Sequence, residues 1–194
     1  MSKTSLKEVF EVFGGPEEVF TAGKGGKAPF KALEAFSEDL CAGVKAFDAW
    51  DCVDNEISLI EKNGAQVITF LDAGYPMLLK EINDPPCLLY VKGERVEFEG
   101  PAVAIVGTRH PSHYGLKMSE VLARDVAGAG VTVVSGMARG CDSAAHKGAL
   151  SVKGHTTAVL GTGVDVVYPR ENAKLYTEII KDGAMISEQP MSTP

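Results

Sequence analysis

The stretch VVSGMARGCDSAAHKGAL, residues 133–150, carries the clearest signal of the fold in this chain. It begins as a β-rich run, passes through glycines 136 and 140 on either side of Arg139, and continues as an alanine-rich helical pattern behind Asp142. A strand that turns through glycine into a helix is half of a βαβ unit. Such a junction either serves close packing or holds a negatively charged group at the start of the helix.

The same pattern recurs over much of the chain. Short, unbroken apolar runs predict strands at 65–71, 87–91, 102–106, 131–135, 156–160 and 184–187. Helical patterns intervene at 115–129, 143–152 and 172–182. This alternation predicts an α/β fold with a Rossmann-like, doubly wound, mostly parallel sheet. Unbroken apolar runs also indicate strands that are covered on both faces.

The first 63 residues differ, because their apolar residues recur at helical spacing. Helices are expected at 4–13, 16–22, 29–42 and 48–63. Two helices joined by Gly14-Gly15 either grip a DNA backbone as a helix-hairpin-helix or form a packing module. We therefore expect a small N-terminal helical domain over 1–63 and a Rossmann-like domain over 64–194.

Composition indicates a soluble globular protein, with 45% apolar and 23% charged residues. No run of 18 apolar residues is present, so we expect no membrane span and no membrane partner. The N-terminus lacks a signal-peptide pattern, which favours a cytoplasmic location. The four cysteines, at 41, 52, 87 and 141, show no C-x-x-C spacing and are expected to be reduced thiols.

The charge distribution says more than the net charge of −7. Residues 101–175 carry eight Lys or Arg against five Asp or Glu, a net charge of +3, whereas the remaining residues carry −10. All four histidines also fall within 101–175. This asymmetry favours a locally basic surface on an acidic protein.

Three predicted strands run into glycine-containing loops, each with one arginine: Arg109, Arg139 and Arg170. These loops are expected at the carboxyl edge of the sheet, where ligands bind close to a reversal of strand order. Glycine lets the backbone approach a ligand, and Ser112 and Asp142 are the expected N-caps of helices whose free amides attract anions. Because the arginine fork matches phosphate oxygens, the pattern predicts phosphate binding.

Several of these features have a plainer interpretation. Glycine after a strand also serves tight packing, and the arginines can form outward ion pairs. Tyr114 and Tyr168 either stack on bases or pack against the sheet. Asp165 either bonds a ribose or caps a turn, and His146 either orients the second loop or acts as a general base.

Catalytic and metal motifs are missing from the sequence. There is no G-x-S-x-G elbow to make Ser135 a nucleophile, no G-x-G-x-x-G and no P-loop lysine. His110 and His113 have no further metal-binding residues clustered with them in the sequence. We therefore expect no catalytic residue, no metal and no cofactor.

At these loops the sequence resembles the bacterial DNA-processing proteins called DprA or Smf. The resemblance rests on AIVGTRHPSHYG (104–115), VVSGMARGCDSAAHKGAL (133–150), TTAVLGTGVDVVYPRENAKLY (156–176) and ISEQP (186–190), with DAGYPMLLKEINDPPCLLYVKG (72–93) as a lead-in. The family's Rossmann-like core continues further, so the resemblance implies that its C-terminal part is missing here. The helical segment 1–63 is similar to the family's small N-terminal domain, with weaker motif support.

The resemblance implies a protein that binds and protects incoming single-stranded DNA in natural transformation, helps to load a RecA-type recombinase, forms a homodimer in its full-length form, and needs no catalysis. It implies that Arg109 grips a phosphate and that Arg139, Arg170 and Lys174 contribute. Together with the loop analysis, it gives the following predicted DNA- or phosphate-binding residues: Gly107, Thr108, Arg109, Ser112, Tyr114, Ser135, Gly136, Met137, Ala138, Arg139, Gly140, Gly161, Gly163, Tyr168, Arg170, Asn172 and Lys174. Asp142, His146 and Asp165 are the predicted structural support.

Two other functions stay open at this point. One is a nucleotide-binding or nucleotide-hydrolysing Rossmann-like enzyme. Related enzymes carry a PGG-x-GT-x-x-E motif, which this sequence lacks, and Glu188 is the nearby acid of interest. The other is a protein-docking module in which the loops are purely structural.

Overall fold

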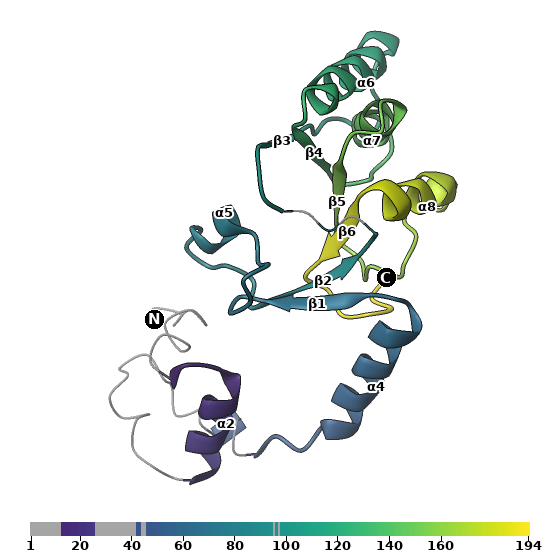
Figure 1. The fold of residues 1–194 in the computed structure, drawn as a ribbon. Helices are drawn as coiled ribbons and strands as arrows, with labels where there is room; N and C mark the ends of the chain where they lie inside the picture. Colours follow the sequence, from purple (N-terminus) through teal and green to yellow (C-terminus); the bar gives the residue numbers. More distant parts are fainter. Residues whose placement is uncertain (1–12, 26–41, 44–45, 95, 97) are drawn as a thin grey trace.

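The computed structural model describes residues 13–25, 42–43, 46–94, 96 and 98–194 (Figure 1). The helices expected at 4–13 and 29–42 lie almost wholly outside these residues, and so does the first helix of the proposed helix-hairpin-helix. The other two expected N-terminal helices are present as α2 (Pro16–Gly25) and α4 (Trp50–Lys62). In the described part of the chain, no helix is long and apolar enough to cross a membrane.

The remaining residues build one six-stranded sheet in the order β1-β2-β6-β5-β4-β3. The strands are β1 (Gln66–Thr69), β2 (Leu88–Lys92), β3 (Ala102–Ala104), β4 (Thr132–Ser135), β5 (Thr156–Leu160) and β6 (Ala184–Ser187). The four strands β3 to β6 are parallel, whereas β1 and β2 are added antiparallel beside β6. The predicted α/β Rossmann-like fold is confirmed.

The helices that connect the parallel strands lie on one face of the sheet (Figure 1). They are α6 (His113–Gly128), α7 (Cys141–Ser151) and α8 (Ala173–Asp182), and the short helix η2 (Arg170–Asn172) precedes α8. Strands β3, β4, β5 and β6 follow one another in space, so the expectation that the loops lie close to a reversal of strand order is wrong for the parallel strands. Because each crossover is right-handed, all three helices arrive on the same face.

The opposite face of the parallel strands is partly open, so the expectation of strands covered on both faces is wrong for β3 and β5. Ala102 and Ala104 of β3 are exposed, and Val159 of β5 is 46% exposed. A second cluster, which includes Tyr75 and Leu89, covers this face only around β2 and β6. The short helix α5 (Met77–Lys80), which the sequence did not predict, lies beside that cluster. An unbroken apolar run therefore did not indicate two covered faces here.

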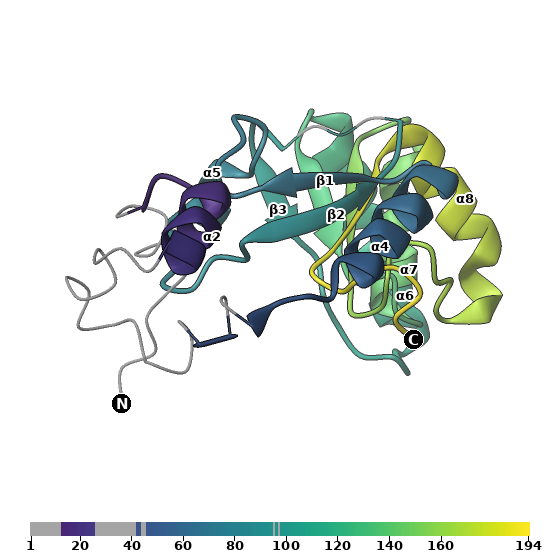
Figure 2. The same ribbon diagram turned by 90° about the horizontal axis from the view of Figure 1, so that it is seen from below.

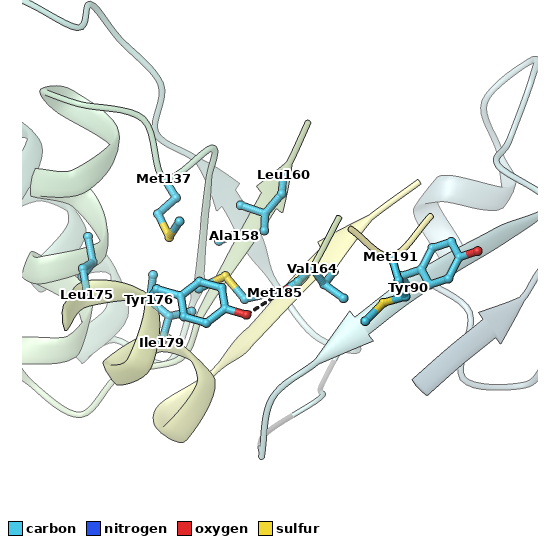
Figure 3. Packing of buried hydrophobic residues seen from close by; sticks show 10 residues of the cluster. All are labelled: Tyr90, Met137, Ala158, Leu160, Val164, Leu175, Tyr176, Ile179, Met185 and Met191. Carbon is cyan, nitrogen blue, oxygen red and sulfur yellow. Dashed lines mark hydrogen bonds between the residues drawn. The ribbon is translucent and has the colours of Figure 1, made fainter. Parts of the chain in front are cut away.

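The main core lies between the sheet and α8 (Figure 3). Tyr176 and Ile179 of α8 pack with Ala158 of β5 and Met185 of β6, and the Tyr176 hydroxyl donates a hydrogen bond to the Val164 carbonyl. Burying each large aliphatic side chain here contributes about 2 kcal/mol to folding. Met137 and Val164, from the loops after β4 and β5, also belong to this core, so it helps to position those loops.

Helix α4 packs against the same core, as the view from below shows (Figure 2). Leu59 and Ile60 lie against the main cluster, and the Glu56 carboxylate accepts a hydrogen bond of 2.7 Å from the Met191 amide. The last helix of the predicted N-terminal segment is thus attached to the Rossmann-like sheet. The division of domains at residue 63 stays a prediction.

His146 is buried and connects α7 to the sheet through a hydrogen bond. Its Nδ1 lies 2.8 Å from the Thr156 hydroxyl, and that hydroxyl donates to the Val133 carbonyl at 2.8 Å. Because the single hydroxyl proton is used on Val133, Nδ1 must carry a proton and donate to Thr156. Burial lowers the pKa of His146 to about 4. The residue is therefore neutral at pH 7, and it bonds to β5 rather than to the second loop.

We predict that His146 makes the protein's stability depend on pH. An unfolded histidine has a pKa of about 6.5. Between about pH 6.5 and 4, His146 is therefore protonated in the unfolded protein but neutral in the folded protein. The contribution of neutral His146 to the free energy of unfolding is fully present above pH 6.5. It is lost as the pH falls towards the folded pKa of about 4. This shift corresponds to about 3 kcal/mol of unfolding free energy.

The measurement is urea unfolding at several pH values for the wild type, His146→Gln and the exposed control His110→Gln. The advantage of the wild type over His146→Gln should shrink by about 3 kcal/mol between pH 7 and 4, whereas His110→Gln should track the wild type. Parallel pH profiles for wild type and His146→Gln would contradict the prediction.

Candidate functional site

The loops that follow β3 and β4 touch one another directly. The Cys141 amide, at the start of α7, donates to the Thr108 carbonyl at 3.3 Å. Gly140 has φ +82°, and a Cβ atom built on it would lie 2.4 Å from that same carbonyl oxygen. Only glycine fits this conformation and this close approach. Arg109 and Arg139, each adjacent to one of these residues, are therefore held on neighbouring segments of backbone.

The second loop is anchored from inside the protein. Met137 has a left-handed backbone with φ 55°, and its side chain is fully buried beside Leu175, Tyr176 and Ile179 (Figure 3). The side-chain amide of Asn172 donates a hydrogen bond of 2.8 Å to the Met137 carbonyl. This bond ties the loop to η2, which contains Arg170. All three arginine-bearing segments are thus linked along one edge of the sheet.

The start of α7 differs from the prediction. Gly140, not Asp142, is the N-cap residue, and Asp142 lies one residue inside the helix. Its carboxylate instead accepts a hydrogen bond of 3.3 Å from the Ala138 amide. The Cys141 and Ser143 amides are already bound to the Thr108 and Ala138 carbonyls, because the loop folds back onto the helix. The expectation of free amides for an anion at these two positions is wrong.

The start of α6 keeps donors available. Ser112 is its N-cap, as predicted, and accepts a hydrogen bond of 3.2 Å from the Gly115 amide. Within the part of the chain that the structure describes, no acceptor is found for the amides of His113 and Tyr114. This 16-residue helix therefore presents uncommitted N–H groups beside Arg109 at the positive end of its dipole.

The three arginines differ in their charge partners. Arg109 and Arg170 are exposed, and neither forms an ion pair with any described residue. Arg139 pairs with Glu171, which raises the pKa of the Arg139 guanidinium and lowers the pKa of the Glu171 carboxyl. The edge thus holds two unpaired cations and one that is already neutralised.

Four predicted ligand residues are buried, contrary to expectation. Ser135 donates its hydroxyl to the Ile105 carbonyl at 2.7 Å, Met137 lies in the core, and Gly163 and Asn172 are enclosed. The exposed members of the predicted set are Gly107, Thr108, Arg109, Ser112, Tyr114, Arg139, Gly161, Tyr168, Arg170 and Lys174. Gly136, Ala138 and Gly140 are partly exposed. Polar or small residues within the loop motifs therefore divide into a surface set and an internal set that shapes the loops.

The loop after β5 is held by the last residues of the chain. Asp165 accepts hydrogen bonds from the amide and hydroxyl of Ser192, at 2.8 and 3.0 Å. The Gly163 amide donates to the Thr193 carbonyl at 2.8 Å. The Asp165 carboxylate therefore joins this loop to a segment 27 residues further along the chain.

Sequence reasoning missed four residues beside the second loop: Leu116, Glu120, Lys147 and Glu171. The first three line a cavity with Arg139, and Glu171 neutralises that arginine. A signal for Lys147 was available, because it lies four residues after Ser143 and therefore on the same face of α7. The ion pair spans 32 residues and had no local signal. Among the described residues, no group of three or more metal-binding side chains is found.

Comparison with known families gives one clear match. The family model described as DNA recombination-mediator protein A matches residues 66–194. Protein Smf of Synechocystis is 40% identical over 137 residues, which cover 69% of this chain and 34% of that protein. The chain spans between about a third and a half of the length of the curated relatives it matches.

Solved structures of DNA processing proteins are similar to this chain. The DNA processing protein A of Streptococcus pneumoniae has a TM-score of 0.72 and 28% identity, covering 100% of this chain and 70% of that one. The DNA processing protein A of Helicobacter pylori, whose structure concerns its single-stranded DNA binding mode, has a TM-score of 0.57 and 30% identity. That match covers 67% of this chain and 58% of the other.

We predict that Gly140→Ala is strongly destabilising. The added Cβ would collide with the Thr108 carbonyl, and alanine at this position would have to adopt a positive φ. The contact between the two loops must therefore open. A loss of about 2–4 kcal/mol in unfolding free energy is expected.

The matched control is Gly161→Ala, in the exposed loop after β5, where a new Cβ meets nothing within 4 Å. This change should cost less than about 1 kcal/mol. Urea unfolding of both variants measures the difference, and equal losses would show that the Gly140 contact is not a structural constraint.

Proposed function

The chain belongs to the DNA recombination-mediator protein A family, and from this premise we propose that it binds single-stranded DNA along the edge formed by the loops after β3 and β4 and by η2. The observation that carries the proposal is the pair of exposed arginines, Arg109 and Arg170, without ion-pair partners among the described residues. The free amides at the start of α6 add uncharged donors for phosphate oxygens.

The mode of binding follows from the kind of group presented. Guanidinium groups and backbone amides contact phosphates, which are the same in every sequence, so the binding is independent of sequence. Tyr114, 74% exposed, and Tyr168, 59% exposed, are available to stack on bases. Lys174 adds a further cation after η2. Its Nζ lies 3.7 Å from Oε1 of Glu178, with which it forms an ion pair.

The wider role is proposed from the family. The protein protects incoming single-stranded DNA in natural transformation and helps to load a RecA-type recombinase, in the cytoplasm and without a catalytic step. A homodimer is the assembly proposed from the full-length family. The Helicobacter pylori relative, whose structure addresses single-stranded DNA binding, supports the choice of ligand.

Three acids beside the loops give no support to the alternative of a nucleotide-hydrolysing enzyme. Asp142 accepts from the Ala138 amide, Asp165 from Ser192, and Glu171 from Arg139. Each of these three carboxylates is engaged in holding a loop or a cation. Glu188, the acid of interest for that alternative, is exposed and forms no ion pair with a described residue. His146 is fully buried and its Nδ1 is bonded to Thr156, so it does not reach a substrate at the edge as a general base.

We predict that Arg109→Ala weakens the binding of every single-stranded oligonucleotide by about tenfold. The variant loses one phosphate contact, so the slope of log affinity against log salt should become shallower by about 0.7. The measurement is a fluorescence titration with several oligonucleotide sequences between about 50 and 200 mM NaCl.

The matched control is Arg124→Ala on α6, whose guanidinium pairs with Asp125 at 2.8 Å. It removes the same charge away from the loop edge and should leave affinity and slope almost unchanged. A selective loss for one sequence, or equal effects of the two variants, would refute phosphate binding by Arg109.

We also predict that Glu171→Gln raises the affinity. Glu171 occupies the Arg139 guanidinium, and a phosphate must compete with it for the same donors. Removing the carboxylate should strengthen binding severalfold at low salt. The control Asp125→Asn removes one negative charge and frees Arg124 away from the edge. Unchanged affinity in Glu171→Gln would show that Arg139 takes no part.

A further inference from the structure

Strand β3 lies at one end of the sheet, where it pairs with β4 on one side only (Figure 1). The Pro101 carbonyl accepts a hydrogen bond from β4, and the Ile105 amide donates one to β4, both at 2.9 Å. Successive residues of a strand direct their backbone groups to alternate sides. The N–H and C=O groups of Ala102 and Ala104 therefore point away from β4.

This outer side of β3 is open and apolar. Within the described residues, the structure gives no hydrogen bond to the backbone groups of Ala102 and Ala104. Both residues are exposed, and Val106, which continues the run, is 74% exposed. Between residues 100 and 108 there is no charged side chain of the kind that protects edge strands. The edge is therefore able to accept a further strand.

The side chains of β3 favour such an addition. Ile105 packs into the cluster beneath α6 and α7, so Ala102, Ala104 and Val106 face the opposite side of the sheet, which is partly open. Val103, on the helical side, is 38% exposed. An added strand would cover apolar surface on both faces as well as satisfying the backbone groups.

The sequence around β3 is complementary to itself when two copies pair antiparallel about Ala104. In this register Ala102 is opposite Val106 of the other copy, so a small side chain faces a larger one. Glu99 of one copy reaches the end of the pair where Arg109 of the other copy lies. Both are exposed, and neither forms an ion pair with a described residue. A two-fold axis repeats this charge complementarity at both ends.

We propose that two copies of this chain associate through β3, antiparallel and centred on Ala104, so that the two sheets become continuous. Ala104 exchanges both backbone hydrogen bonds with its counterpart, and Ala102 does the same with Val106. The inference does not depend on the proposed function, because no DNA takes part in the contact. An exposed ion pair is weak, so a phosphate can still replace the Glu99 carboxylate at Arg109.

The test is sedimentation equilibrium of the full chain without DNA, from about 1 to 100 μM. Ala104→Lys sets two like charges opposite each other across the axis, and should raise the dissociation constant of the dimer by at least about tenfold. The matched control is Ala73→Lys, which adds the same charge at an exposed position between β1 and α5, at the other end of the sheet. It should leave the dissociation constant unchanged.

A charge exchange tests the register. Glu99→Lys replaces attraction to Arg109 by repulsion at both ends of the pair, and should raise the dissociation constant by about fivefold. Combining Glu99→Lys with Arg109→Glu restores opposite charges in exchanged positions, so the constant should return towards the wild-type value. Urea unfolding of each variant shows whether it remains folded.

A wild type that stays monomeric over the whole concentration range would overturn the proposal. So would Ala104→Lys that associates as strongly as Ala73→Lys, since the contact would then lie elsewhere. A double variant that associates no better than Glu99→Lys rules out this register. Loss of the dimer in Ala104→Lys, with recovery in the double variant, supports the pairing of β3 with its counterpart.

Discussion

The arrangement of the loop edge depends on the close approach of Gly140 to the Thr108 carbonyl. This contact brings the loop after β4 against the loop after β3, with no room for a side chain between them. Met137 holds the same loop from beneath, and Asn172 joins it to η2. The three segments that carry Arg109, Arg139 and Arg170 are therefore positioned by one set of packing and hydrogen-bonding constraints. A basic edge on a protein of net charge −7 follows from this arrangement.

The three arginines of the edge differ in how far their charges are neutralised by neighbouring carboxylates. Arg109 and Arg170 carry charges that no described carboxylate neutralises, whereas Arg139 is held by Glu171. In the proposed mode of binding, the guanidinium groups of Arg109 and Arg170 contact a phosphate directly, whereas that of Arg139 must exchange one anionic partner for another. In this account, phosphates of the strand bind along the edge.

Local patterns in the sequence were sufficient to predict the fold class, the strands, the three helices that connect the parallel strands and the N-cap Ser112, but not the short helix α5. They were not sufficient to separate surface loop residues from internal ones. Ser135, Met137 and Gly163 share the motifs of the exposed residues, and only tertiary packing shows that they are buried. The open face of β3 and β5 was missed because unbroken apolar runs do not reveal which side of a sheet the crossovers occupy. The pair Arg139–Glu171 was missed because it joins distant segments.

The most direct test of the account is amide hydrogen exchange with and without a single-stranded oligonucleotide. The account predicts that added DNA slows exchange together at residues 107–115, 136–140 and 168–174, since one strand contacts all three segments. Exchange around α5, on the opposite face of the sheet, should not change. Protection confined to one of these loops, or located around α5 instead, would contradict the claim that the three arginine-bearing segments form a single DNA-binding edge.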